Sequence, residues 1–395
     1  MRILITSRNY RPQKGGIETY LHHLALEMVS QGHAICVVAS YSEGCKAFDR
    51  KQPFITKRIH RRLFWTPIWT LRLFYYALSA GSDVVINGEW RSGIHTYLIR
   101  HLMPFQYFTI AHGTELQDTN LTWKHRIWKR LGFLRYKILQ ASDGIFPNSA
   151  YTKSLLQEMG LSMGKTHIVN PAVDPKEFYP TEKPNYLIRK YGVEDHKVIL
   201  SASRLVPHKG HETVIRALPK VCRQIPQIKY LILGAGHHRN YLEGLVKYLN
   251  LEQYVIFTGF VADRDLKDYY NLADVFIMLS QAMENFCQVE GFGIAFLEAN
   301  ACATPVIGGK SGGVEDAVLH GQTGSVIDPF SADDCADTLI QYLENPEFAT
   351  AQGKAGRLRV ETELNWTAST ERMLAIIESD SSYGSNPVSD LEVIR

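Results

Sequence analysis

Short runs of β-branched and aliphatic residues alternate with longer segments of helical periodicity along most of the chain. This alternation is typical of βαβ units, in which parallel strands are connected by helices that cover the sheet. In the first half, strands are predicted at residues 2–7, 34–39, 84–87, 107–111 and 144–147. Helices are predicted at residues 18–31, 70–80, 96–102, 123–141 and 150–159.

A proline-rich segment then interrupts the alternation, and we interpret residues 173–190 as a linker. Behind it, strands are predicted at residues 198–202, 229–233, 255–258, 275–278, 305–308 and 324–327. Helices are predicted at residues 211–225, 239–249, 263–273, 294–302, 313–319, 332–345 and 366–379. The simplest α/β architecture is two Rossmann-like domains, residues 1–172 and 191–365, facing each other across a cleft. The polar residues 380–395 are expected to form a flexible tail.

The composition is close to that of an average soluble globular protein, since 45% of the 395 residues are hydrophobic and 21% are charged. The most apolar segment, residues 63–78, contains Pro67 and Arg72 and is shorter than the ~20 residues that a spanning helix needs. The first residues lead directly into a predicted strand, so we expect no signal peptide. The six cysteines form no CxxC pair, which favours a cytoplasmic location.

Charge is distributed unevenly between the two halves. Residues 1–172 carry a net charge of +12 and residues 173–395 carry −9, which gives +3 for the whole chain. We interpret the difference as further evidence for two domains, of which the first faces an acidic partner. Nucleic acid, a membrane surface and phosphorylated small molecules are candidates for that partner.

Glycine-rich loops follow predicted strands in both halves. Gly15 and Gly16 stand just before a predicted helix, where backbone N–H groups can approach a phosphate. The pattern is not GxGxxG, and the segment from Gly234 to Gly236 lacks a third glycine. A nicotinamide-dependent oxidoreductase is therefore disfavoured.

Charged residues follow two predicted strands of the second half. Arg204 and Lys209 lie on a loop at a strand's carboxyl end, where they can bind a phosphate together. Glu290 and Glu298 flank a Gly-Phe-Gly sequence that opens the next helix. Glu290 can accept hydrogen bonds from vicinal sugar hydroxyls, and Glu298 can reach a second diol such as a ribose.

Together these motifs resemble glycosyltransferase family 4 over nearly the whole chain. The resemblance is carried by Gly15-Gly16, Ala111-His112-Gly113, Asn170-Pro-Ala-Val-Asp174, Arg204 with Lys209, and the segment from Glu290 to Glu298. Residues 203–210, 289–299 and 309–316 are most similar to the bacterial phosphatidylinositol-mannoside mannosyltransferases. The sequence Asn-Phe-Cys-Gln at residues 285–288 departs from the glycine-rich residues expected there. The family implies a retaining enzyme of the GT-B fold with a nucleotide-sugar donor.

The resemblance also implies roles for individual residues. The catalytic residues would be His112, Arg204, Lys209 and Glu290, with the two cations stabilising charge on the leaving diphosphate. The donor would be bound by Gly15, Gly16, Arg204, Lys209, Glu290, Phe292, Gly293, Ile294 and Glu298. Glu115 would assist His112, and the last helix would pack back onto the first domain. No DxD-type cluster falls at this site, so neither a metal nor a cofactor is expected.

The acceptor is inferred from the basic first half. Residues 50–82 contain seven Lys or Arg residues and no acid, interleaved with aromatic residues. Residues 119–142 contain six more and no acid, together with Trp123 and Trp128. Such composition is typical of a surface that binds anionic lipid, and no nucleic-acid motif accompanies it. The expected membrane or acceptor surface consists of Lys57, Arg58, Arg61, Arg62, Trp65 and Trp69.

The sequence thus predicts a cytoplasmic glycosyltransferase that lies peripherally on the inner face of a membrane. It would move a hexose, best taken as mannose from GDP-mannose, to a hydroxyl of a lipid-linked or membrane-associated acceptor in glycolipid or polysaccharide synthesis. A UDP-sugar-dependent transferase with a soluble acceptor is the alternative. A nucleotide-sugar epimerase of the same fold and a non-catalytic membrane adaptor are further alternatives.

Overall fold

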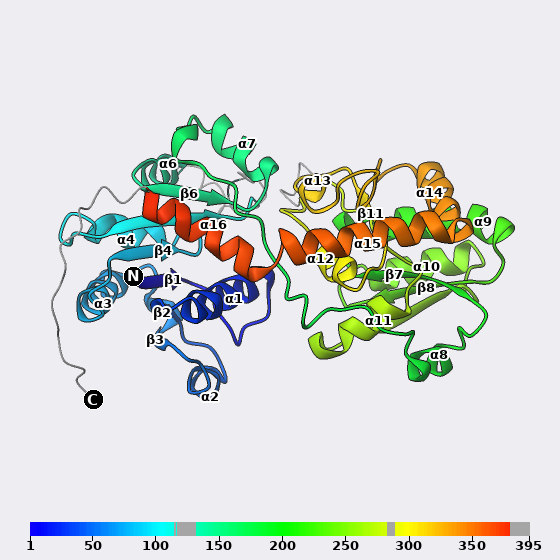
Figure 1. The fold of residues 1–395 in the computed structure, drawn as a ribbon, viewed down its shortest axis with the longest axis horizontal. Coiled ribbons are helices and arrows are strands. Elements are labelled where there is room, and N and C mark those ends of the chain that lie inside the picture. The colour runs from blue at the N-terminus through cyan, green and yellow to red at the C-terminus, as the bar shows by residue number, and fades with distance from the viewer. Residues whose placement is uncertain (114–115, 117–131, 283–288, 380–395) are drawn as a thin grey trace.

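The computed structural model describes residues 1–113, 116, 132–282 and 289–379. Within these residues the chain forms two six-stranded sheets, one from each half (Figure 1). All paired strands run parallel, in the orders β3-β2-β1-β4-β5-β6 and β12-β11-β10-β7-β8-β9. The expected pair of Rossmann-like domains is confirmed. In each sheet the strand order reverses between two central strands, which are β1 and β4 in the first and β10 and β7 in the second.

The first sheet contains β1 (Arg2–Ser7), β2 (Ala34–Ser40), β3 (Ile55–Ile59), β4 (Val84–Asn87), β5 (Gln106–Ala111) and β6 (Gly144–Pro147). Its helices are α1 (Gly16–Ser30), α2 (Cys45–Asp49), α3 (Pro67–Ser79), α4 (Gly93–Ile99), α6 (Gly132–Gln140) and α7 (Ala150–Glu158), with short 3-10 turns η1 (Arg61–Leu63) and η3 (Met163–Lys165). Because helices cover both faces, the central strands are buried along nearly their whole length.

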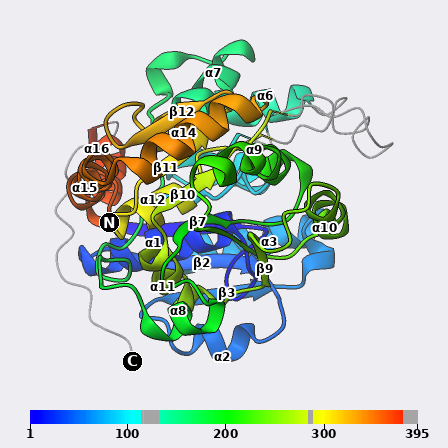
Figure 2. The same ribbon diagram turned by 90° about the vertical axis from the view of Figure 1, so that its right-hand side faces the viewer.

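The second sheet contains β7 (Lys197–Ala202), β8 (Ile228–Leu233), β9 (Val255–Gly259), β10 (Val275–Met278), β11 (Val306–Gly309) and β12 (Gly324–Ile327). Its helices are α8 (Asn185–Tyr191), α9 (His211–Gln224), α10 (Arg239–Tyr248), α11 (Leu266–Leu272), α12 (Ile294–Ala301), α13 (Val314–Ala317), α14 (Ala332–Glu344) and α15 (Pro346–Thr362), with turns η4 (Pro207–Lys209) and η5 (Asp263–Asp265). Figure 2 shows these helices around the sheet, and each of its faces is covered by its own apolar cluster.

Each of the eleven predicted strands coincides with an observed one, but β3 was not predicted. Its sequence, Ile-Thr-Lys-Arg-Ile, belongs to an edge strand, and we had assigned these residues to the basic surface segment. Helices α2, α8 and α15 were not predicted either. Helix α8 begins inside the linker predicted at residues 173–190, and the small and charged residues of α15 give only a weak apolar stripe. Most of the predicted helix at 123–141 and the tail at 380–395 lie outside the described residues.

The last helix, α16 (Trp366–Ser379), belongs to the first domain although it follows the second in sequence. Trp366, Met373, Leu374 and Ile377 join the same apolar cluster as the inner face of α1. The chain therefore crosses between the domains twice. The two crossings bond to each other, since the Val173 N–H donates to the Leu364 carbonyl at 3.0 Å.

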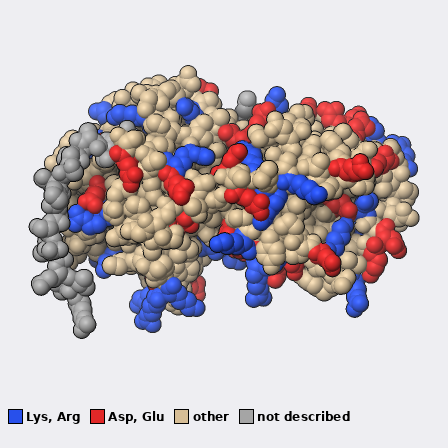
Figure 3. All heavy atoms as spheres, in the orientation of Figure 1, with Lys and Arg blue, Asp and Glu red and all other residues tan. Residues whose placement is uncertain are grey.

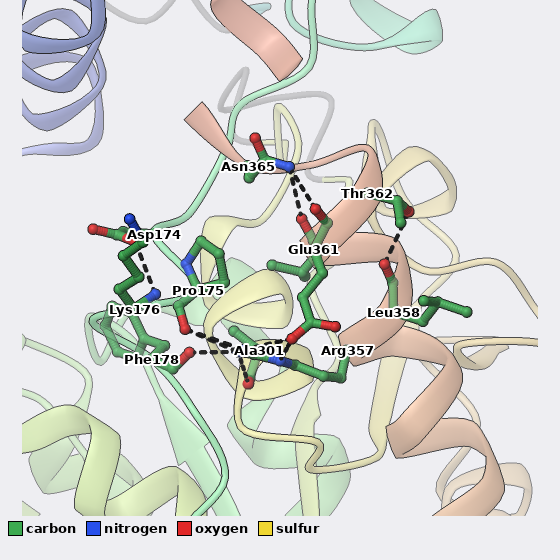
Figure 4. A network of polar contacts seen from close by, with 11 residues as sticks. Asp174, Pro175, Lys176, Phe178, Ala301, Arg357, Leu358, Glu361, Thr362 and Asn365 are labelled. Atoms are coloured by element: carbon green, nitrogen blue, oxygen red, sulfur yellow. Dashed lines mark hydrogen bonds and ion pairs between the residues drawn. The ribbon is translucent and has the colours of Figure 1, made fainter. Parts of the chain in front are cut away.

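Arg357 of α15 fixes the first crossing to the second domain (Figure 4). Its guanidinium donates to the carbonyl oxygens of Pro175, Phe178 and Ala301, at 2.6–3.2 Å. The bonds to Pro175 and Phe178 hold the start of the linker, and Ala301 is the last residue of α12. One side chain thus connects the linker, α12 and α15.

Candidate functional site

The loop after β7 carries the two expected cations. Arg204 is exposed, and Lys209 ends η4 just before α9. Gly210 connects η4 to α9 with a φ of +70°, and a Cβ there would lie 1.9 Å from the Leu279 carbonyl oxygen. Only glycine allows this approach. The close contact brings the end of β7 against the end of β10, where Lys209 meets its partner.

That partner is Glu290, whose carboxylate forms an ion pair with the Lys209 ammonium. The same oxygen also accepts a hydrogen bond from the Ser280 hydroxyl at 3.1 Å. Burial acts to raise the pKa of Glu290, but the charge and hydrogen bond of Lys209 and the hydrogen bond of Ser280 outweigh it and hold the pKa below its usual value. Glu290 is therefore an ionised hydrogen-bond acceptor in the wall of the cleft.

Helix α12 begins immediately after this carboxylate. Gly293 precedes it with a φ of +99°, and a Cβ there would lie 2.6 Å from the Phe296 ring. Phe292 is buried in the core of the second domain and anchors the loop. The N–H groups in the first turn have no acceptor within the helix, so they can donate to hydroxyls or phosphate oxygens.

The first domain contributes α1 and the residues after β5 and β6. Nε2 of His112 donates to the Gly88 carbonyl at 2.9 Å, and its ring meets the edge of Tyr20. The Asn148 side-chain amide donates to the His112 carbonyl at 3.3 Å. Both the ring and the backbone of His112 are thus held in place at the carboxyl edge of the sheet.

A cleft of about 540 Å³ lies between the two carboxyl edges. Its lining includes eight of the predicted site residues, namely Gly16, His112, Arg204, Lys209, Glu290, Phe292, Gly293 and Ile294. Gly15 and Glu298 do not line it. They line an adjoining cavity of about 280 Å³, which also contacts Gly16 and Ile294.

Glu298 lies one turn into α12 and accepts a hydrogen bond from the Tyr270 hydroxyl at 2.6 Å. Burial raises its pKa to about 7, the Tyr270 hydrogen bond opposes the rise, and the carboxylates of Glu177 and Asp263 add to it. A third cavity, of about 270 Å³ and with mainly apolar walls, opens between Glu298 and Arg204. The shape and lining suit a nucleoside whose ribose contacts Glu298 and whose phosphates extend toward Arg204.

The two domains also touch directly beside the cleft. A Cβ on Gly291 would lie 2.5 Å from the His112 carbonyl oxygen. The Ala150 N–H, at the start of α7, donates to both carboxylate oxygens of Asp316 in α13, at 3.0 and 3.1 Å. These contacts hold the domains close to each other around the site.

Residues of the site that sequence reasoning missed include Tyr20, Asn148, Tyr270 and Ser280. Asn148 and Ser280 come one and two residues after β6 and β10. The rule that ligands bind at the carboxyl ends of parallel strands applies to both of them. Tyr20 and Tyr270 lie inside helices, where nothing in the sequence distinguishes them from core residues.

Two members of the predicted membrane or acceptor surface are buried, which corrects that prediction. Trp69 is 0% exposed and packs against Phe64 and His95 beneath α3. The Arg58 side chain is 8% exposed, pairs with Asp49 at 2.7 Å and donates to the Ser40 carbonyl. Trp69 faces the sheet because it shares the inner side of α3 with Leu73 and Ala77. The other four residues, Lys57, Arg61, Arg62 and Trp65, are exposed.

Some expected features fall outside the part of the chain that the structure describes. These are Glu115, Trp123, Trp128 and the departure at residues 285–288. Among the described residues, no helix is long and apolar enough to span a bilayer. The same residues contain no group of three or more His, Cys, Asp or Glu side chains that could hold a metal ion.

Two Rossmann-like domains facing a cleft, with cations at one wall and helix N-termini on both sides, define the GT-B class of glycosyltransferase. Residues 14–177 match the family described as Glycosyltransferase Family 4, and residues 186–359 match Glycosyl transferases group 1. The chain belongs to this family and is a hexosyltransferase. The epimerase and adaptor alternatives are therefore set aside.

Relatives align along nearly the whole chain. The GDP-mannose-dependent monoacylated alpha-(1-6)-phosphatidylinositol monomannoside mannosyltransferase of Corynebacterium glutamicum is 36% identical over 387 residues, covering 96% of this chain and 98% of the relative. The GDP-mannose-dependent alpha-(1-6)-phosphatidylinositol monomannoside mannosyltransferase of Mycobacterium tuberculosis is 29% identical over 388 residues, covering 96% and 98%.

Solved structures share the fold. Sucrose-phosphate synthase of Thermosynechococcus elongatus superposes with a TM-score of 0.77 at 25% identity, covering 96% of this chain and 98% of that one. Anabaena HepE, solved in complex with UDP, superposes with a TM-score of 0.81 at 18% identity, covering 96% and 100%. At 18% identity, the similarity to HepE shows only that the two proteins share a fold.

The first prediction concerns the two cations. We expect Arg204→Ala and Lys209→Ala to lower turnover by about 10²–10³, since each removes a charge that is predicted to stabilise the leaving diphosphate. Steady-state transfer assays and thermal unfolding should be measured together, because Lys209→Ala also strands the buried Glu290 carboxylate. Lys247→Ala, an exposed cation of α10, is the matched control. Turnover within threefold of wild type in both variants would contradict the assignment.

The second prediction concerns pH. Glu298 has a pKa of about 7 and accepts hydrogen bonds from a diol best when ionised, so nucleotide affinity should rise with pH through that value and level off above it. Glu298→Gln should bind nucleoside diphosphate more weakly and lose this component of the pH dependence. Calorimetric titrations of wild type and Glu298→Gln across this pH range distinguish the titration of Glu298 from that of the nucleotide's own phosphate. Identical pH profiles for the two proteins would show that Glu298 does not contact the ribose.

Proposed function

We propose that the protein is a retaining mannosyltransferase that moves mannose from GDP-mannose to a hydroxyl of a lipid-linked or membrane-associated acceptor in glycolipid or polysaccharide synthesis. The observation that carries the proposal is the cleft that places the Arg204, Lys209 and Glu290 wall opposite His112. The mannosyltransferase relatives of Corynebacterium and Mycobacterium support the choice of donor sugar and acceptor class.

In the proposed mechanism, Arg204 and Lys209 bind the donor diphosphate and stabilise the charge that develops as it leaves. Glu290 and the first N–H groups of α12 hold the hydroxyls of the sugar. The acceptor hydroxyl attacks from the face that the diphosphate leaves, and the departing phosphate oxygen takes its proton. His112 contacts the donor sugar near its primary hydroxyl.

The Lys209–Glu290 ion pair is part of this mechanism. The ion pair holds the ammonium at the wall of the cleft, where the diphosphate would bind. Lys209 then shares its charge between the phosphate and Glu290, and the Ser280 hydroxyl keeps one hydrogen bond on the carboxylate. Such preorganisation avoids reorganising charge during the reaction.

The outer face of α3 supports a peripheral membrane location. Its side chains Ile68, Leu71, Tyr75 and Leu78 are 45%, 66%, 63% and 58% exposed, and Trp65 beside them is 45% exposed. Lys57, Arg61, Arg62 and Arg72 surround this stripe and are exposed too. An apolar helix face bordered by cations and an aromatic residue is typical of interfacial helices.

The charge distribution also favours docking through the first domain. In Figure 3, basic side chains gather over the lower edge of the first domain around α2, and acidic side chains are frequent on the second. An anionic bilayer attracts the first domain and repels the second. We therefore place the protein on the inner face of the membrane, with the second domain in the cytoplasm.

The third prediction identifies the donor. Thermal-shift measurements across GDP-mannose, GDP, UDP-glucose, UDP-galactose and UDP should show stabilisation by the guanine nucleotides. Transfer assays with GDP-mannose should also give slow hydrolysis of the donor when no acceptor is present. Stabilisation by UDP and UDP-sugars alone would replace GDP-mannose with the UDP-sugar alternative.

The fourth prediction tests membrane docking. Vesicles of equal parts phosphatidylglycerol and phosphatidylcholine should bind the protein strongly at low salt, and pure phosphatidylcholine vesicles should bind it weakly. Each cation near the surface contributes about 1 kcal/mol, so Lys57→Ser with Arg62→Ser should weaken binding by about thirtyfold. Leu71→Ser with Tyr75→Ser should also weaken it.

The matched control is Tyr248→Ser with Leu358→Ser, which removes two side chains of the second domain that are 80% and 61% exposed. This pair should bind vesicles as wild type does, and all variants should keep their affinity for nucleotide. Equal partitioning to neutral and anionic vesicles, or binding to neither, would contradict membrane docking and favour a soluble acceptor.

A further inference from the structure

The first sheet has its own reversal point, between β1 and β4. In open parallel sheets, ligands bind outside the carboxyl ends of the strands at such a point. In the second sheet, Lys209 and Glu290 occupy the equivalent place, after β7 and β10. In the first sheet this place is occupied by Arg8, directly after β1, and by residues 88–91, directly after β4.

Arg8 is held firmly at this point. Its Cζ atom lies 5.6 Å from the centre of the Phe64 ring and 5.7 Å from that of Trp65. Its backbone N–H donates to Glu89 at 2.9 Å, and the other Glu89 oxygen accepts from Ser7 at 2.7 Å. Nε of Arg8 is buried and makes no hydrogen bond within the described residues. The guanidinium plane of Arg8 is thus fixed against the two rings.

Two further cations lie on the segments that contact Arg8, which are the turn carrying Phe64 and Trp65 and the residues after β4. Arg61 opens η1, three residues before Phe64, and Arg91 lies two residues after Glu89 with its Cζ 5.4 Å from the Trp90 ring. Burial and the charges of Arg61 and Arg91 lower the pKa of Arg8, and Glu89 opposes this shift. The positive charges of these arginines therefore act on one another, and an anion bound among them would offset that repulsion.

This cluster lies beside the reaction cleft. His112 donates to the carbonyl of Gly88, the residue before Glu89. Burial raises the pKa of the Glu18 carboxyl, and His112, Arg11 and Arg61 all act to lower it. Since His112 bonds to Gly88, which directly precedes the segment that carries Glu89 and Arg91, these residues and His112 lie on the same edge of the sheet.

We propose that Arg8, Arg61 and Arg91 form an anion subsite that holds a phosphate group of the acceptor. Guanidinium groups bind phosphate with paired hydrogen bonds, and a stacked, half-buried arginine positions it precisely enough to orient the rest of the acceptor. The inference rests on the proposed function only in calling the ligand an acceptor. A phosphodiester of a lipid head group and a phosphate monoester of a soluble sugar share this chemistry.

Calorimetry on the full chain tests the subsite. The protein is first saturated with GDP, or with UDP if the donor measurements select it, so that phosphates cannot bind at Arg204 and Lys209. Glycerophosphoinositol, glucose 6-phosphate and myo-inositol are then titrated into wild type, Arg61→Gln, Arg8→Lys and the control Arg50→Gln. Arg50 is an exposed cation at the end of α2, away from the reversal point.

At least one phosphate compound should bind wild type and Arg50→Gln equally and Arg61→Gln about tenfold to a hundredfold more weakly. Arg8→Lys keeps the positive charge but loses the paired N–H donors of the guanidinium, so this variant should also bind the phosphate compound more weakly. Any binding of myo-inositol and the affinity for nucleotide should not change. Preference for the diester identifies a lipid head group, and preference for the monoester identifies a soluble acceptor.

Three outcomes would overturn the subsite. They are equal phosphate binding by wild type, Arg61→Gln and Arg8→Lys, an equal loss in Arg50→Gln, and no binding of either phosphate compound to wild type. None of these depends on the sugar donor or on vesicle binding, so failure of the subsite and failure of the proposed function are distinguishable.

Discussion

The pairing of the two chain crossings is the constraint on which the cleft depends. Val173 enters the second domain and Leu364 leaves it, and the hydrogen bond between them makes both crossings one narrow connection. Arg357 fastens the first crossing to α12 and α15. Because α16 returns to pack on α1, the second crossing leads straight back into the first domain. The two carboxyl edges are thus held facing each other across the cleft.

The predicted site residues beside the cleft lower the free energy of unfolding of the protein. The Lys209–Glu290 pair is largely buried, and removing one partner of such a pair typically costs about 3–5 kcal/mol because the other charge is left uncompensated. Glu298 is half-buried, and its pKa is raised to about 7. The arginines at the β1–β4 reversal point repel one another. A bound ligand would supply hydroxyl donors to the two carboxylates and negative charge to the arginines.

Much of the fold could be predicted because parallel strands buried on both faces read as apolar runs. Edge strand β3 could not, since its alternating basic residues resemble a surface segment. Arg204, Lys209 and Glu290 could be predicted as site residues because they are charged, stand after predicted strands and have glycines close by. Their pairing could not be predicted, because Lys209 and Glu290 are 81 residues apart and meet near the place where Gly210 contacts Leu279. Helix α3 is apolar on both faces, so its sequence did not reveal that Trp69 points inward while Leu71 points outward.

The segment from Arg61 to Trp65 connects the proposed membrane surface with the proposed acceptor subsite. Trp65 lies beside the exposed stripe of α3, and its ring also packs against Arg8 at the β1–β4 reversal point. A lipid-linked acceptor could keep its chains in the bilayer at α3 and place its phosphate among the arginines. Its hydroxyl would then reach toward His112, which hydrogen-bonds to Gly88 one residue from Glu89. On this arrangement, one short turn determines both where the protein docks and which part of the acceptor enters the cleft.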